Sequence, residues 1–133
     1  MSKTFATLLS LAALAAILPL GSTSARAASN PISIIHCFVI QPRPMSRTAG
    51  GTQIVYVNNG SKTATRITFQ VGYRNAENKY LRKVTDVGNF APGAQIDHRF
   101  DLFSDVTYAG KQTQSCSAIS VRWSDGTAWF ANQ

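Results

Sequence analysis

The 133-residue sequence is poor in the side chains that most enzymes use. Asp and Glu total six against 13 Lys and Arg, there are two His and two Cys, and Glu77 is the only glutamate. The chain has no Gly-x-Ser-x-Gly elbow, no His-Glu-x-x-His motif and no glycine-rich phosphate loop. These absences remove the usual signatures of hydrolases, metalloproteases and nucleotide-binding enzymes. We therefore expect a protein that is not an enzyme and needs no cofactor.

Long hydrophobic runs are also scarce, and the one at residues 8–20 is too short to span a bilayer, which takes about 20 residues. Lys3 precedes the run, and Ala25 and Ala27 place small residues at the −3 and −1 positions of a cleavage site. This pattern predicts a secretory signal peptide over residues 1–27. We expect a secreted or periplasmic protein, a single domain over 28–133 and no stable membrane span after cleavage.

The charge balance is positive without being concentrated. Removal of Lys3 and Arg26 with the signal peptide lowers the formal net charge from +7 to +5. Such a charge favours anionic partners but does not specify one, and solubility explains it equally well. Because the protein is expected to be exported, we do not expect nucleic acid among its partners.

Cys37 and Cys116 are the only cysteines, and they lie near opposite ends of the predicted domain. An even count in an exported protein predicts a disulfide between them. A redox or metal pair is the alternative, and the absence of a Cys-x-x-Cys spacing and of a surrounding His cluster disfavours it.

Residues 65–74 have the clearest structural pattern in the chain. Ile67, Phe69, Val71 and Tyr73 alternate with polar residues and glycine, which predicts a β-strand with one face on a core. We expect the alternating Thr68 and Gln70 to be exposed. Other segments of strand character are 32–40, 52–57, 79–85, 95–102, 115–123 and 128–130.

Turn residues separate these segments. Asn and Gly at 58–62 predict a turn with positive φ, Pro92-Gly93 predicts a type II turn, and Asp125-Gly126 predicts a hairpin. Segment 32–40 is apolar in both phases, which indicates a strand covered on both sides or crossing between sheets. Seven strands with no helical pattern predict an all-β antiparallel sandwich.

From Ile54 to Phe100 the chain resembles the immunoglobulin-like FxLYD-type domains of bacterial secreted proteins. The resemblance is carried by residues 57–61, by the alternation from Ile67 to Tyr73, by Leu81 and by the Pro-Gly turn before Phe100. Arg74 stands where this family usually has Asp, and Asn78 where it usually has Gly. The resemblance implies an immunoglobulin-like sandwich and a non-catalytic extracytoplasmic module.

The histidines supply the alternative function. His98 shares the apolar phase of its segment, which predicts a partly buried, hydrogen-bonded side chain. If segments 32–40 and 95–102 met, His36 could approach His98, and with a free thiol the two could ligate zinc or copper. A small metal-binding or hydrolytic secreted protein is therefore the second hypothesis. Asp97 and Asp101 share a phase as a conceivable carboxylate pair, although Arg99 lies between them.

The first hypothesis is a binding or structural module of the cell envelope, its partner an unknown protein or an anionic envelope component. Gly72 would let a ligand approach the sheet closely. Trp123 and Trp129 flank the hairpin turn, and we expect core packing there rather than an exposed platform. The predicted binding face comprises five basic residues on the central strands: Arg66, Arg74, Lys79, Arg82 and Lys83.

Overall fold

The structure is a computed structural model that describes residues 28–41, 45, 49–104 and 110–132. The predicted signal peptide lies outside these residues. The described chain is all-β and contains no helix. Its seven strands are β1 Ile32–Ile40, β2 Gly51–Asn58, β3 Ala64–Arg74, β4 Lys79–Phe90, β5 Gln95–Phe100, β6 Thr113–Trp123 and β7 Ala128–Phe130.

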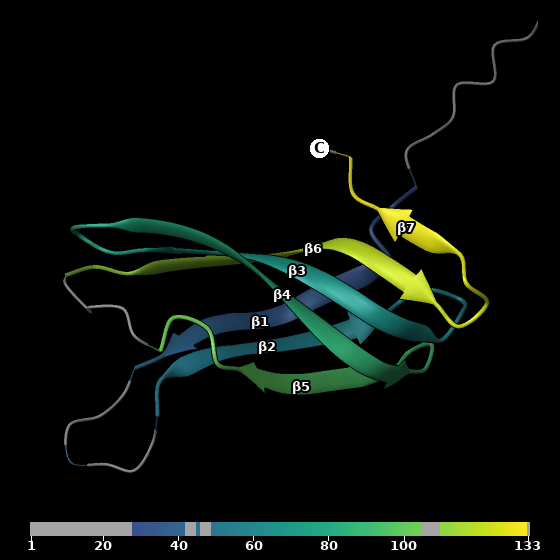
Figure 1. Cartoon of the computed structure of the whole chain (residues 1–133), viewed down its shortest axis with the longest axis horizontal. Coiled ribbons are helices and arrows are strands. Elements are labelled where there is room, and N and C mark those ends of the chain that lie inside the picture. The colour runs from purple at the N-terminus through teal and green to yellow at the C-terminus, as the bar shows by residue number, and fades with distance from the viewer. Residues whose placement is uncertain (1–27, 42–44, 46–48, 105–109, 133) are drawn as a thin grey trace, which may run out of the picture.

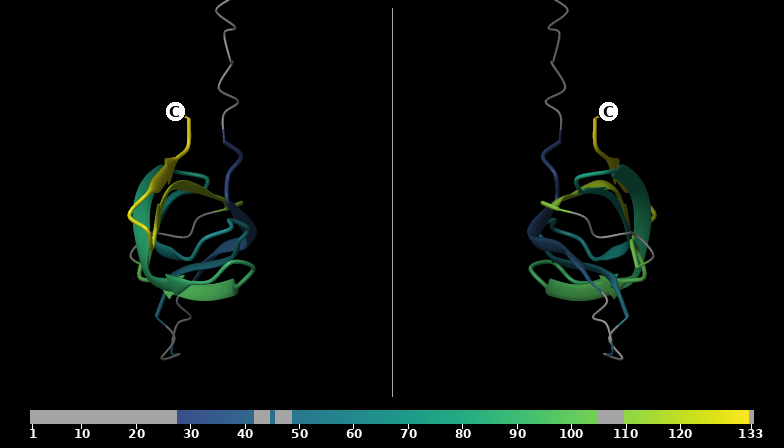
Figure 2. Two further views of the ribbon diagram at one scale, coloured as in Figure 1. Left: turned by 90° about the vertical axis from the view of Figure 1, so that its right-hand side faces the viewer. Right: turned by 90° about the vertical axis from the view of Figure 1, so that its left-hand side faces the viewer.

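The strands form two antiparallel sheets that face each other (Figure 1). Sheet A has the order β1-β2-β5, and sheet B has the order β4-β3-β6-β7. Seen end-on, the two sheets curve around a common interior (Figure 2). In the described residues, this arrangement confirms the coarser expectation of an all-β chain with seven strands in antiparallel sheets.

Strand β3 lies in the middle of sheet B, and its alternation is confirmed. Ile67, Phe69 and Val71 are fully buried and Tyr73 is 1% exposed. Across the interior, the ring of Tyr56 on β2 lies 4.9 Å from that of Phe69, joining the two sheets. Thr68 and Gln70 are partly buried, against the expectation that they would be mostly exposed. Because β3 has a neighbour on each side, adjacent side chains cover part of its outer face.

Strand β1 is an edge strand of sheet A with a bulge at Ile35. The bulge shifts the alternation, so that Ile32 and Ile34 face the interior before it and Cys37 and Val39 face the interior after it. This shift explains why the segment is apolar in both phases. It is covered on one side only, because Ile35 and Phe38 are more than 40% exposed.

Two strands end elsewhere than predicted. Strand β4 continues past Thr85 to Phe90, since the inward positions Val84 and Phe90 continue to pack on the core. Strand β5 ends at Phe100 rather than residue 102. Leu102 and Phe103 then close one end of the core, with Phe103 fully buried and in a left-handed conformation at φ 62°. The sequence did not indicate this role.

The turn after β2 is held by a side chain rather than by positive φ. Asn58 is buried, donates to the carbonyls of Lys62 and Phe90, and accepts from the amide of Gly60. The turn predicted at 58–62 is present, but none of its residues has a positive φ. Gly60 is needed because a Cβ there would lie 2.6 Å from the ring of Trp123.

The predicted disulfide is confirmed. Cys37 on β1 and Cys116 on β6 are bonded, with their Cα atoms 5.9 Å apart and a sequence separation of 79. The bond joins sheet A to sheet B along the side where β1 approaches β6. A disulfide is compatible with a periplasmic or extracellular location.

Candidate functional site

A buried carboxylate joins the two sheets on the side opposite the disulfide. Asp86 on β4 is 2% exposed, and its Oδ2 accepts from the hydroxyl of Tyr56 at 2.8 Å. The same oxygen lies 2.7 Å from Nδ1 of His98 on β5. Since β4 belongs to sheet B and the other two strands to sheet A, these contacts fasten the sheets together.

Burial keeps the hydroxyl of Tyr56 protonated. Removal of Tyr56 from water, together with its hydrogen bond to Asp86, raises the pKa of the phenol well above its ordinary value of 10. The hydroxyl therefore remains a donor to the carboxylate at every physiological pH. The side chain of His98 is 48% exposed, whereas the side chain of its partner Asp86 is 2% exposed. The histidine therefore lies at the boundary between the buried carboxylate and solvent.

The cluster pairs a histidine with a carboxylate, but no nucleophilic hydroxyl is hydrogen-bonded to that histidine in the described part of the chain. Among the described residues, His98 hydrogen-bonds Asp86 and stacks near Phe100, at 4.4 Å between ring centroids. A nucleophilic hydroxyl would have to lie within hydrogen-bond reach of the histidine. The geometry therefore supports a structural tie between sheets. The prediction of a hydrogen-bonded, partly buried His98 is confirmed.

The sequence did not single out this cluster. Asp86 was placed just beyond the predicted end of its strand at Thr85, so its inward phase was not visible. With β4 extended to Phe90, Asp86 is in phase with Val84 and pairs with buried Ile67. A carboxylate on the inward phase, facing a strand with an inward histidine, is the signal that would have revealed it.

The structure does not bring the two histidines together, which contradicts the arrangement that a metal site needs. Strand β2 lies between β1 and β5. His36 is level with Val55 and Asp97, whereas His98 is level with Ile54 and Cys37, so the histidines point to opposite faces of sheet A. Cys37 is consumed by the disulfide. In the described part of the chain no three His, Cys, Asp or Glu side chains cluster as a metal site.

The conceivable carboxylate pair does not form a catalytic arrangement either. Asp97 lies on the outer face of sheet A and accepts a hydrogen bond from Gln53. Asp101 follows the end of β5. Arg99, which lies between them, donates to the backbone carbonyls of Ala49 and Gly50.

The outer face of sheet B, which points away from sheet A, gathers positive charge. Four predicted residues belong to it, because Arg66 and Arg74 alternate with the buried side chains of β3, and Lys83 and Lys79 pair with outward positions of β3. Arg122 on β6 pairs with Arg66 and adds a fifth cation that the sequence analysis did not include. We call these five exposed residues the basic face: Arg66, Arg74, Lys79, Lys83 and Arg122.

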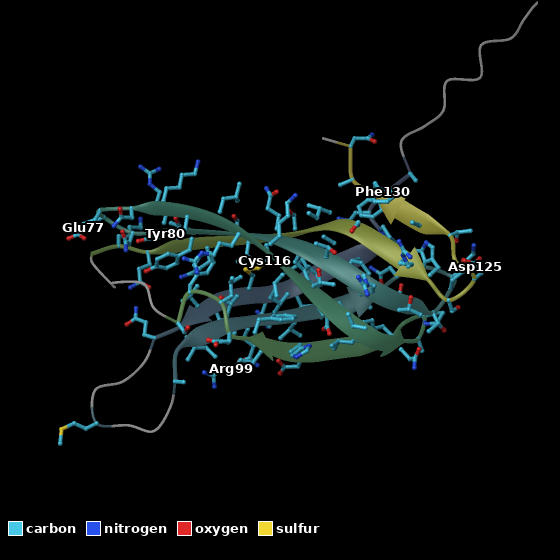
Figure 3. All side chains as sticks on the ribbon, in the orientation of Figure 1. Glu77, Tyr80, Arg99, Cys116, Asp125 and Phe130 are labelled. Atoms are coloured by element: carbon cyan, nitrogen blue, oxygen red, sulfur yellow. A yellow bond between two sulfur atoms is a disulfide. The ribbon has the colours of Figure 1, made fainter. Side chains whose placement is uncertain are left out.

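Among the described residues, the strands of this face carry no carboxylate on their outward side, although Glu77 in the β3–β4 turn lines a hollow together with Arg74 and Lys79. The outward positions of β3, β4, β6 and β7 contain no Asp or Glu. Glu77 and Asp125 lie in turns at the two ends of the sheet (Figure 3). Asp125 pairs with Lys62 at 2.5 Å, which lowers the pKa of its carboxyl. Within the described residues, none of the five cations forms an ion pair.

Arg82 is the exception among the predicted binding residues. It pairs with buried Val71 and therefore occupies the inward phase of β4. Its guanidinium lies over the ring of Phe103 at 5.1 Å and near Tyr80 at 5.9 Å. Arg82 thus covers the rim of the core and does not belong to the basic face.

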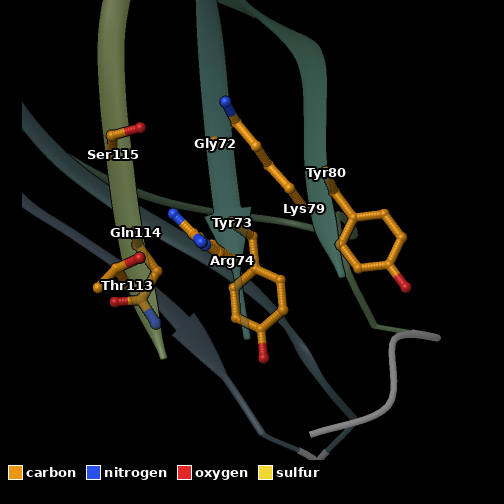
Figure 4. A pocket seen from close by; sticks show the side chains of 8 residues that line it. All are labelled: Gly72, Tyr73, Arg74, Lys79, Tyr80, Thr113, Gln114 and Ser115. Atoms are coloured by element: carbon orange, nitrogen blue, oxygen red, sulfur yellow. The ribbon is translucent and has the colours of Figure 1, made fainter. Parts of the chain in front are cut away.

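A hollow of about 240 Å³ indents the basic face where β3, β4 and β6 run side by side (Figure 4). Gly72 lines it, and a Cβ there would lie 2.6 Å from Oγ of Ser115. Arg74 and Lys79, which are level with each other across β3 and β4, supply two cations. Two cations beside a hydroxyl suit an anionic group with hydrogen-bond acceptors.

The tryptophans near the last turn pack against the core, as expected. Trp129 lies opposite Val121, and both it and Trp123 are partly buried against the central cluster. The exposed aromatic of this region is instead Phe130, which is 69% exposed and opposite Ser120 on the outer face of sheet B. Leu81 and Val87 on β4 are likewise more than 60% exposed.

Comparison of the chain with protein-family models, with curated proteins and with solved structures gave no match. The structure itself defines the class of the described chain, which is all-β with two sheets linked by a disulfide. A search of the described residues for helices with the length and hydropathy of a membrane span found none.

Proposed function

We propose that this protein is a non-catalytic, immunoglobulin-like binding module of the periplasm or cell exterior, which attaches to an anionic component of the cell envelope. The basic face is its binding surface. The resemblance to FxLYD-type domains supports the module, and the signal-peptide pattern and the disulfide support the location.

One observation carries the binding role. Among the described residues, five exposed cations share a sheet face whose strands have no outward carboxylate, whereas on the outer face of sheet A Asp97 and Arg99 occupy the same phase of β5. If the cations served solubility alone, acidic residues would be expected among them, as on a mixed surface. A face of one sign attracts a partner of the opposite sign.

The test is adsorption of the exported, disulfide-bonded protein to anionic and neutral surfaces at low and physiological salt. We expect binding to acidic polysaccharide or anionic vesicles but not to their neutral counterparts. Binding should weaken as salt rises, because exposed charges are screened within about 8–10 Å.

The variant that tests the face is Arg66→Ala/Arg74→Ala. Both side chains are exposed and make no ion pair among the described residues, so the variant should fold normally. It should bind anionic material more weakly than the wild type and show a shallower salt dependence. Equal binding by the two proteins, or equal binding to anionic and neutral surfaces, would contradict the proposal.

A further inference from the structure

Three hollows follow one another along the outer face of sheet B. The first, at Gly72 and Arg74, is the hollow of about 240 Å³ described above. The second is lined by Gln70, Lys83 and Ser117 and measures about 580 Å³. The third, about 70 Å³, lies between Arg66, Ser120, Arg122 and Phe130. We call this series the hollow row.

The hollow row is long because it follows two adjacent strands. Its β3 members run from Arg74 through Gln70 to Arg66. At about 3.3 Å per residue, the strand carries the two arginines about 26 Å apart. A single sugar or phosphate group cannot contact both ends, whereas an extended polymer can.

Each hollow combines positive charge with neutral hydrogen-bonding groups. The first has Arg74 and Lys79, the second Lys83, and the third Arg66 and Arg122. Strand β6 contributes a serine to each: Ser115, Ser117 and Ser120. Hydroxyls both donate and accept, so they match sugar hydroxyls, while the cations match carboxylates.

The apolar residues of the face do not favour a lipid surface as the partner. Leu81 and Val87 lie on the edge strand β4, and Phe130 lies on the opposite edge strand β7. The outward positions between them, on β3 and β6, are polar or glycine except for Ile119 at a bulge. Pressing that polar centre against a bilayer would remove hydroxyl and amide groups from water without replacing their hydrogen bonds.

We propose that the hollow row binds a linear acidic polysaccharide lying along β3 and β6. Its carboxylates pair with Arg74 and Lys79 at one end and with Arg66 and Arg122 at the other. Its hydroxyls hydrogen-bond the serines between them. This inference rests on the proposed function, since it specifies the ligand of the same face.

Ligand length is the first test. Binding of the exported protein is measured by calorimetry against galacturonic acid, a series of oligogalacturonides and polygalacturonate, with neutral dextran beside them. We expect affinity to rise steeply with length until the oligomer reaches both arginine ends, because linked subsites raise the effective concentration of the second contact. If affinity instead rose in proportion to the number of charges and did not level off once the oligomer spans both arginine ends, the inference would be overturned.

Shape is the second test, through the charge-neutral variants Gly72→Ala and Ser115→Ala. Gly72→Ala adds a Cβ that would lie 2.6 Å from Oγ of Ser115 in the first hollow. Ser115→Ala removes that hydroxyl from the lining. Each should weaken oligogalacturonide binding by up to about tenfold, the effect of one lost hydrogen-bonding contact. Neither should change adsorption to anionic vesicles. Thermal melts show whether Gly72→Ala folds, and Ser115→Ala tests the same hollow if it does not.

The outcomes separate this inference from the proposed function. If vesicles and polysaccharide bind equally well and neither neutral variant has an effect, the hollow row is not a polysaccharide site, although the basic face still binds anions. Tighter binding to anionic vesicles than to polygalacturonate assigns the face to the membrane and overturns the inference. If no anionic material binds the wild type, both proposals are wrong.

Discussion

Oδ2 of Asp86 lies 2.7 Å from Nδ1 of His98, and this contact joins β4 to β5 across the open side of the sandwich. The bond between Cys37 and Cys116 joins β1 to β6 on the other side. The two sheets are thus tied at both margins, once by a buried carboxylate and once by a covalent bond. This gives sheet B a fixed frame on which its outer face can serve as a binding surface.

Removal of Asp86 should cost more unfolding free energy than removal of its partner His98. Asp86→Ala leaves the buried hydroxyl of Tyr56 without its acceptor, which should cost about 1–3 kcal/mol of unfolding free energy. His98→Ala should cost less than about 1 kcal/mol, because the histidine is half-exposed and water can replace it. Urea unfolding of both variants measures this. A cost at His98 equal to that at Asp86 would contradict the assignment of the tyrosine as the main partner.

Stability should fall in alkali because of Tyr56. Its pKa is raised in the folded state, so its contribution is complete below the ordinary phenol pKa of about 10 and is lost as pH rises toward the folded value. Tyr56→Phe should be less stable than wild type at pH 7, and the difference should shrink above about pH 10, where the unfolded wild type ionises. Denaturant midpoints across this range test it; a difference independent of pH would show that the phenol is not protected.

Removal of the disulfide should cost about 2–5 kcal/mol, the usual range for a small secreted domain. Cys37→Ser/Cys116→Ser removes it without leaving an unpaired thiol. Chemical unfolding of this double variant beside the oxidised wild type gives the value. Thiol labelling of the folded wild type is the companion measurement, and two reactive thiols would contradict the bond itself.

The two faces of β3 should respond differently to truncation. Phe69 is fully buried and its ring packs against Tyr56 and Phe100 of the opposite sheet, so Phe69→Ala should cost about 3–5 kcal/mol. Gln70 is half-exposed on the outer face, so Gln70→Ala should remain within about 0.5 kcal/mol of wild type. Comparable losses at both positions would mean that the outer face is covered by another part of the protein.

Local patterns predicted the strands well because alternation is a property of each strand alone. Phe69 and its neighbours were assigned from period-2 spacing, and β1 and β7 have the predicted bounds. Partners across strands depend on topology, which spacing does not reveal. The separation of His36 from His98 by β2 is one case, and the addition of Arg122 beside Arg66 is another.

The wrong face was also predicted for a side chain where strand alternation was ignored, and an inward side chain was missed where a strand was ended too early. Arg82 was grouped with Lys83 by sequence proximity, yet adjacent strand residues point to opposite faces. Asp86 was overlooked because its strand was predicted to end at Thr85, five residues before its actual end at Phe90. Phe103 could not be placed because no regular pattern surrounds it, and its burial results from the three-dimensional closure of the core.

The central claim is that charge on the outer face of sheet B binds an anionic partner, and Lys83 and Arg82 test it most directly. They are neighbours on one strand and carry the same charge, but only Lys83 belongs to the basic face. The measurement is the affinity of Lys83→Gln and Arg82→Gln for polygalacturonate at low salt, relative to wild type. Our account predicts a loss for Lys83→Gln alone. Equal losses would mean that net charge, rather than this face, governs binding, and would contradict the account.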